Sequence, residues 1–221
     1  MTMRIPVALA TVLVSMVMAF PALGQPVKDA APAEVDLAAR VKAIQANPRQ
    51  FDAFYKIGAK SAAVCANCHG DNGNSTNPDI PNLAGQNPAY LLEQMRQFIS
   101  DERRNEFMQG LMKALKPEEK VSIVVFYSRQ DIQHKPATNE ALAAKGQEYY
   151  AKNCLSCHGE QGRGNEKMPQ VAGQQPNYLS VALKRYRSGS IVRKDTQMSV
   201  VTQPMTDADI ATVVTYISAM K

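Results

Sequence analysis

The residues with the most reactive side chains lie in one short pattern that occurs twice. The first copy is VCANCHGDNGN at residues 64–74, and the second is NCLSCHGEQGRGN at residues 153–165. Both contain Cys-x-x-Cys-His, and together they hold all four cysteines and all but one of the histidines of the 221-residue chain. Thiols and imidazoles at this spacing could bind zinc, form disulfides, act as a redox dithiol or attach a haem.

Covalent attachment of haem c accounts best for the pattern. Two thiols three residues apart reach the two vinyl groups on one edge of the porphyrin, and the adjacent histidine is directed at the iron. A zinc ribbon needs its two cysteine pairs about 15 to 20 residues apart, a thioredoxin-like motif needs a βαβ context, and two disulfides would leave the repeated histidine unexplained. We therefore expect two haems, attached and ligated by Cys65, Cys68, His69, Cys154, Cys157 and His158.

The sequence around the two motifs is duplicated as well. With Cys65 aligned on Cys154, the segment PNLAGQNPAYL at 81–91 lies over PQVAGQQPNYL at 169–179. The ends also match, since ALKPEEKVSIVVFYS from residue 114 parallels PMTDADIATVVTYIS from residue 204. The offset between the copies stays between 88 and 90, which indicates one domain used twice with single-residue insertions or deletions.

The repeat register also selects the second axial ligand of each iron. His134 has no counterpart in the other copy and is expected to be a solvated residue of the linker, so methionine is the usual remaining ligand. Of the eleven methionines, Met108 and Met198 occupy equivalent positions in the two copies. We predict that these two bind iron, with Met112 as the alternative for the first site.

Helices are expected to position these side chains. One helix should lead into each motif, and another should begin near Tyr90 and Tyr178. The last helix of each copy has start signals: Pro117 precedes two glutamates, and Thr206 with Asp209 resembles a capping box. The segments VSIVVFY and IATVVTY are rich in β-branched residues, but the caps and the apolar spacing favour helix over strand. The expected fold class is therefore all-α.

The N-terminal sequence indicates an export signal. A charged start, an apolar run and small residues before Gln25 are typical of a secretory signal peptide, with an uncleaved membrane anchor as the alternative. The scattered arrangement of the 25 basic and 20 acidic residues argues against nucleic-acid binding. The expected parts of the chain are a signal peptide (1–24), an N-terminal extension with one short helix (25–51), a first haem domain (52–130), a linker (131–139) and a second haem domain (140–221).

These features together resemble a known family. The paired Cys-x-x-Cys-His-Gly motifs, the two P-x-[LV]-A-G-Q segments and a methionine about 40 residues after each histidine are similar to the di-haem cytochromes of the c4 type. The resemblance covers residues 52–221. It implies two tandem class I cytochrome c domains about a pseudo-twofold axis, with haem propionates meeting near the interface. It also implies that the carbonyls of Pro81 and Pro169 accept hydrogen bonds from Nδ1 of His69 and His158, although a simple turn would explain both prolines.

The propionates bear on the charge of the chain. Each haem would add two carboxylates, so the formal net charge of +5 says little about partners. Arg103 and Arg193 could pair with propionates, and a solvated position is the alternative for both.

The expected function follows from the ligand set. An iron with histidine and methionine on its two faces has no open position, so it passes electrons without binding a substrate. We therefore expect a carrier and not an enzyme: a periplasmic shuttle from a quinol-oxidising membrane complex or a dehydrogenase to a terminal oxidase or reductase. A haem subunit of a larger dehydrogenase is the alternative. A di-haem peroxidase is disfavoured because it needs a displaceable ligand. Peripheral association with a membrane is compatible with the carrier.

Overall fold

The computed structural model describes residues 1–2, 36–193 and 195–221. The signal peptide expected at 1–24 and the first part of the extension lie almost wholly outside the described residues. From Asp36 onward the described residues belong to one compact unit. This unit has no β-strand within its described residues, only an isolated antiparallel bridge between Arg103 and Arg193, so the all-α prediction is confirmed. None of the helices described is long and apolar enough to cross a membrane.

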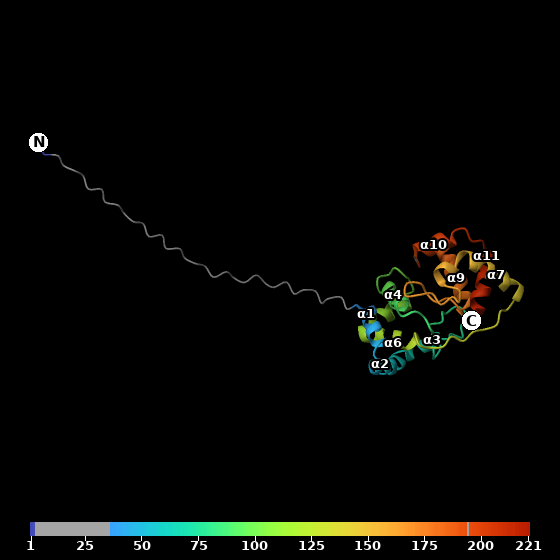
Figure 1. Ribbon diagram of the computed structural model, residues 1–221, viewed down its shortest axis with the longest axis horizontal. Coiled ribbons are helices and arrows are strands. Elements are labelled where there is room, and N and C mark those ends of the chain that lie inside the picture. Colours follow the sequence, from blue (N-terminus) through green and yellow to red (C-terminus); the bar gives the residue numbers. More distant parts are fainter. Residues whose placement is uncertain (3–35, 194) are drawn as a thin grey trace. The chain divides into compact units, whose positions relative to one another are not determined.

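The helices follow the duplication, and Figure 1 shows the blue-to-green and the yellow-to-red helices as two neighbouring groups. The first repeat contains α1 (Leu37–Gln45), α2 (Pro48–Ser61), α3 (Ala63–His69), α4 (Pro88–Ile99), α5 (Glu106–Ala114) and α6 (Pro117–Tyr127). The second contains α7 (Glu140–Asn153), α8 (Leu155–His158), α9 (Pro176–Arg187), α10 (Thr196–Thr202) and α11 (Asp207–Ala219). The two segments that could have been strands are thus the helices α6 and α11.

Each repeat is built on one close helix crossing. Helix α2 crosses α6 at Gly58, where a Cβ atom would collide with the backbone of Ser122. Helix α7 crosses α11 in the same way at Gly146, against the backbone of Thr212. Because the two helices can touch only where a side chain is missing, the glycines hold the helix that leads into each Cys-x-x-Cys-His motif against its own domain.

Helix α1 belongs to the core of the first repeat. Asp36 caps it by accepting hydrogen bonds from the backbone N–H groups of Ala38 and Ala39, both at 3.0 Å. Val41 and Ile44 are each 2% exposed and join the core formed with α2, α4 and α6. Helix α2 then begins at Pro48, before the domain boundary expected at residue 52. The second repeat has its own core and no counterpart of α1 within the described residues.

The linker runs along both domains. Ile132 lies against Gly85 of the first repeat and against Gly173, its equivalent in the second. His134 is half-buried, and its Nδ1 lies 2.7 Å from the carbonyl oxygen of Met220. The expectation that His134 is a solvated residue was therefore wrong, because the imidazole is used to hold the end of the chain.

Two buried glutamines hold the domains together. The Gln86 side chain donates to the carbonyl of Gln170 and accepts from the N–H of Gln170, both at 2.8 Å. The Gln174 side chain does the same to the main chain of Asn82, at 3.0 and 2.7 Å. Gln86 and Gln174 are equivalent in the repeat, as are Asn82 and Gln170. We call these two reciprocal contacts the glutamine clamps. They fix the relative position of the two Cys-x-x-Cys-His motifs.

Candidate haem sites

The first motif lies on the short helix α3. Cys65 is buried and Cys68 is exposed, and both are free thiols. Burial raises the pKa of Cys65, although its interaction with the Tyr127 phenol lowers it in part. His69 is the last residue of the helix, and Gly70 follows with φ = 79°, a left-handed conformation that favours glycine and turns the chain away from the histidine.

His69 is oriented by a backbone carbonyl. Its Nδ1 lies 2.7 Å from the carbonyl oxygen of Pro81, so Nδ1–H can donate and Nε2 is left to bind a metal. Burial lowers the pKa of His69, and the charge of Arg103 lowers it further, against the hydrogen bond to Pro81 that raises it. Burial and the Arg103 charge thus favour the neutral imidazole, which is the form that binds iron.

The second motif repeats this arrangement. Cys154 directly precedes α8, and burial raises the pKa of its thiol to about 11. Nδ1 of His158 lies 3.0 Å from the carbonyl oxygen of Pro169. Burial again lowers the pKa of the histidine, but here the nearby charge is that of Asp195, which raises it. The two sites thus share their geometry and differ in the sign of a neighbouring charge.

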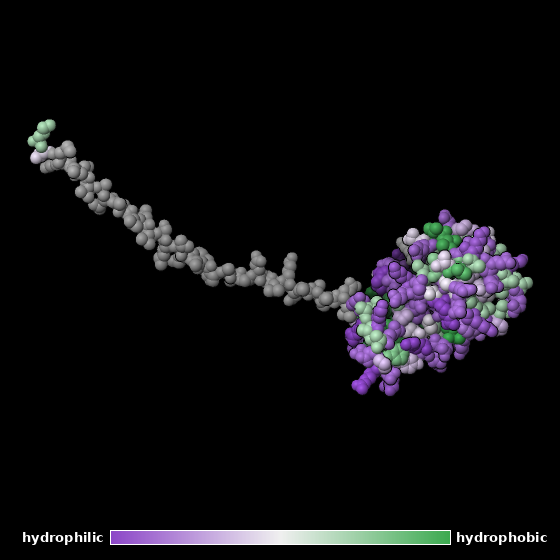
Figure 2. Space-filling model, viewed as in Figure 1, coloured by the Kyte–Doolittle hydropathy of each residue, from purple (hydrophilic) through white to green (hydrophobic). Residues whose placement is uncertain are grey.

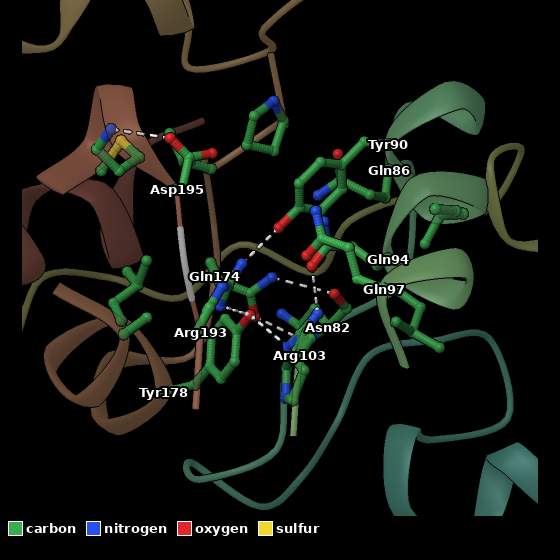
Figure 3. Close-up of a pocket in the computed structure, with 18 of the residues that line it drawn as sticks. Asn82, Gln86, Tyr90, Gln94, Gln97, Arg103, Gln174, Tyr178, Arg193 and Asp195 are labelled. Carbon is green, nitrogen blue, oxygen red and sulfur yellow. Dashed lines mark hydrogen bonds between the residues drawn. The ribbon is translucent and has the colours of Figure 1, made fainter. Parts of the chain in front are cut away.

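Both motifs open onto one cavity of about 680 Å³. Its walls come from both repeats and include all four cysteines, His69 and His158. Figure 3 shows part of the wall, where residues of the two repeats face each other across the boundary between the domains. Two groups held in this cavity would therefore be neighbours, with little polypeptide between them.

A cluster of cations and phenols lies where the domains meet (Figure 3). Arg193, only 7% exposed, donates to the hydroxyls of Tyr90, at 2.6 Å, and Tyr178. Arg103 donates to Tyr178 at 3.2 Å and to Gln94 at 2.6 Å. Burial alone would raise the pKa of Tyr178, but the two guanidinium groups lower it to about 8.

The positive charge of this cluster indicates whether haem would fit the cavity. Neither arginine forms an ion pair with a carboxylate in the described part of the chain. A buried cation without an anion is costly, and the carboxylates that a haem carries on the edge away from its thioethers would supply the missing charge. The solvated alternative does not hold for Arg193. The cavity, the free thiols, the oriented histidines and the two arginines, of which Arg193 is buried, together fit two haem c groups.

The two predicted methionines occupy equivalent positions in the structure. Met108 and Met198 are each the third residue of a short helix, α5 and α10, and both line the cavity. The N–H of Met108 donates to the Asn105 side chain at 3.0 Å, and that of Met198 donates to Asp195 at 2.9 Å. Met112 also lines the cavity and is only 3% exposed. The choice between Met108 and Met112 therefore still depends on the repeat register.

Some residues of the site carried no sequence prediction. The glutamine clamps were visible only as the repeated Gln of the A-G-Q segments, a register signal without an assigned role. Tyr127 lines the cavity with a fully buried ring, and its repeat equivalent is Ile217. The change from tyrosine to isoleucine at matched positions was the signal that could have drawn attention to it.

Comparison with known proteins agrees with this arrangement. A family model for cytochrome c matches residues 55–134 and again residues 143–221. A cytochrome c4 of Thiocapsa roseopersicina is 30% identical over 175 residues, which cover 73% of this chain and 90% of the relative. A thiosulfate dehydrogenase electron acceptor of Thiomonas intermedia (strain K12) is 32% identical over 142 residues, covering 58% of this chain and 65% of the relative.

A solved structure has the same fold. Reduced recombinant cytochrome c4 from Pseudomonas stutzeri is 28% identical, with a TM-score of 0.69, and the similarity covers 75% of this chain and 98% of that one. Two matches to one family model explain the duplicated motifs, and the similarity to cytochromes c4 extends over both copies. The chain therefore belongs to the cytochrome c family as a di-haem electron carrier of the cytochrome c4 type, with two covalently bound haem c groups.

Proposed function

We propose that the chain is a periplasmic shuttle that takes electrons from a quinol-oxidising complex or a dehydrogenase and delivers them to a terminal oxidase or reductase. The observation that carries the proposal is the single cavity shared by the two motifs. Haem c supplies reversible one-electron chemistry at its iron. The polypeptide contributes two oriented histidines and a fixed distance between the sites, so an electron accepted at one end can leave from the other.

In this proposal Met108 and Met198 complete the iron coordination. A thioether opposite each histidine would leave no open position, and it would favour the ferrous state. That ligand set separates a carrier from a peroxidase. Support comes from the equivalent places of the two residues on α5 and α10 and from their position on the cavity wall.

Single substitutions test the ligands. Met108→Ala and Met198→Ala should each remove about half of the weak far-red ferric band that reports sulfur ligation, and each should make one haem able to bind carbon monoxide. Met112→Leu is the matched control, because it replaces another methionine of the cavity wall. Loss of the band in Met112→Leu, with none in Met108→Ala, would move the first ligand to Met112.

The surface around the cavity suits brief encounters with redox partners. Phe107 and Val64 of the first repeat are 67% and 48% exposed, and Val181 of the second is 43% exposed; all three line the cavity. Figure 2 shows a mostly hydrophilic face with separate hydrophobic patches. Small apolar contacts within a polar surface are typical of weak electron-transfer complexes.

The donor and acceptor can be identified by kinetics. Purified di-haem protein should be reduced by membranes given a quinol, or by a dehydrogenase given its substrate, and reoxidised by membranes that contain a terminal oxidase. Thiosulfate belongs in the trial, since one relative is named as the electron acceptor of a thiosulfate dehydrogenase. Stable copurification with a dehydrogenase and no exchange by the free protein would favour the subunit alternative, and rapid turnover of peroxide would favour an enzyme.

Export is part of the same proposal. A protein recovered from the periplasmic fraction should begin near Gln25 and carry the mass of two haems. Retention in the membrane after high-salt washing would favour the uncleaved anchor, and release by salt would indicate peripheral association.

A further inference from the structure

One buried hydroxyl in the first haem domain has no partner in the polypeptide. The Tyr127 side chain is 0% exposed, and its hydroxyl makes no hydrogen bond with any described residue. Among the described residues, it is the only buried side-chain nitrogen or oxygen that makes no hydrogen bond. The side chain lies on the wall of the cavity. A buried hydroxyl that lacks an acceptor costs free energy, so its presence needs an explanation.

The tyrosine ring cannot turn to find an acceptor elsewhere. It packs against Gly73, where even a Cβ atom would collide with the ring, and edge-on against Phe126 with the centroids 5.1 Å apart. The main chain is held too, because the carbonyl of Tyr127 accepts from the N–H of Gly85 at 2.9 Å. The direction of the hydroxyl is therefore set by the fold.

The neighbour of the phenol is the first haem-attachment cysteine. Burial raises the pKa of Tyr127, and the charge of the adjacent Cys65 and the closeness of its sulfur to the hydroxyl raise it further, although the two atoms do not meet in hydrogen-bond geometry. Cys65 itself is buried and lies in the same core. The hydroxyl is thus beside the point where one edge of the first haem is attached.

The duplication provides an internal comparison. Ile217 occupies the equivalent position in the second repeat, is 5% exposed and also lines the cavity. An aliphatic side chain therefore satisfies the fold at this place, and no backbone requirement calls for a phenol. The polypeptide group that acts on the hydroxyl is the Cys65 sulfur, which makes no hydrogen bond of good geometry with it in the described structure and becomes a thioether when the haem is attached.

We propose that Tyr127 donates a hydrogen bond to the thioether sulfur by which Cys65 holds the first haem, and that this bond raises the reduction potential of the first haem relative to the second. The inference rests on the two haems and is independent of which proteins exchange electrons with the chain. A proton directed at the haem stabilises the electron-rich ferrous state more than the ferric state, and hydrogen bonding around a haem is one of the means by which proteins set its potential.

The test is Tyr127→Phe in the di-haem protein. Phenylalanine keeps the ring and its packing, so the variant should fold. One of the two midpoint potentials should shift downward while the other stays unchanged, and NMR signals of the haem methyl groups should assign the shifted one to the first domain. At a fixed potential near that midpoint, the ratio of ferrous to ferric first haem should fall several-fold.

A control and a second readout separate this role from a structural one. Tyr55→Phe removes another phenol hydroxyl of the same domain, one that accepts a hydrogen bond from Gln130 at 3.1 Å and does not line the cavity; it should leave both potentials unchanged. Tyr127→Phe should also lower the melting temperature of the di-haem protein, because a hydrogen bond is lost. Unchanged potentials together with a higher melting temperature would show a hydroxyl with no partner at all and would overturn the proposal.

Discussion

The two copies of the domain make the same glutamine contacts at their boundary, but have different residues inside the two haem sites. At the boundary, Gln86 and Gln174 make the same pair of main-chain hydrogen bonds in opposite directions. Inside the sites, matched positions hold different residues: Asn105 caps α5 in the first repeat and Asp195 caps α10 in the second, each three residues before a candidate methionine ligand. One region has kept its chemistry and the other has changed it.

The difference has a physical reason. A contact between two copies of a domain must suit both copies at once, because a change in either glutamine leaves buried main-chain groups of the other domain unpaired. Asn105 and Asp195 each cap a helix of their own domain, so we expect a change in either residue to act on the haem of that domain. Such a change leaves the main-chain hydrogen bonds of the other domain intact, and we expect it to shift one reduction potential. Unequal potentials in a rigid pair of haems would place the electron preferentially on the haem of higher potential.

Removal of a glutamine clamp should have the largest effect on stability. Gln86→Ala deletes two hydrogen bonds across the boundary and leaves the N–H and the carbonyl of Gln170 buried without partners. We expect a loss of about 3 kcal/mol of unfolding free energy, measured by urea denaturation. Gln174→Ala should cost about as much, since it unpairs Asn82 in the same way.

The control for the clamps is Gln161→Ala, which removes an exposed glutamine with no side-chain hydrogen bond in the described structure. It should leave the unfolding free energy unchanged. If Gln86→Ala and Gln174→Ala lower the unfolding free energy by very different amounts, the two clamps have the same geometry but do not contribute equally to stability.

Exchange of the two helix caps, Asn105 and Asp195, should have an effect of intermediate size. It should change the reduction potentials of the haems and not the stability of the fold. Asp and Asn cap helices about equally well, so Asp195→Asn keeps α10 but removes a negative charge near the second haem. The potential of that haem should rise by an amount worth on the order of 1 kcal/mol. Asn105→Asp should lower the potential of the first haem by a similar amount, as the opposite effects of Arg103 and Asp195 on the two axial histidines suggest.

Potentiometric titration of both variants measures these shifts, and the double variant serves as the control. It exchanges the caps, so the gap between the two potentials should change by about the sum of the single effects. A shift in both haems from one substitution would contradict the view that each cap acts on its own site.

Features that repeat within each domain could be predicted from the sequence, whereas contacts between the domains could not. The helices, the two cytochrome c domains and the two haems could be predicted, because repeated motifs and cap signals are local patterns. The glutamine clamps could not, since a hydrogen bond to the main chain of another domain depends on how the domains pack. His134 was misjudged for the same reason, because its partner, Met220, lies at the far end of the chain. The repeat register predicted Met108 and Met198 as ligands, which stays a prediction, and only the fold showed that Arg193 is buried.

The smallest expected effect concerns a charged group found on one domain only. On the surface of the first repeat, Arg96 forms ion pairs with Glu93 at 2.7 Å and with Glu102 at 2.8 Å. The hydrogen bond from Arg96 lowers the pKa of Glu102 from 4.5 to about 2. In the second repeat, the position that matches Glu93 is Val181, so no such group can form there.

The sign of the pH effect follows from the lowered pKa of Glu102. Between about pH 4.5 and pH 2 the unfolded chain binds a proton at this residue that the folded protein does not, so the stabilisation is present above pH 4.5 and is lost as the pH falls through that range. Glu102→Gln should therefore destabilise the protein slightly at pH 6 and make the urea midpoint less sensitive to acid. The effect should shrink in high salt, because the ion pair lies on the surface with about half of each side chain exposed. Glu148→Gln, an exposed carboxylate of α7 without an ion pair in the described structure, should leave the acid dependence as it is in the wild type; an equal change in both variants would mean that net charge, and not the Arg96 contact, controls the response to acid.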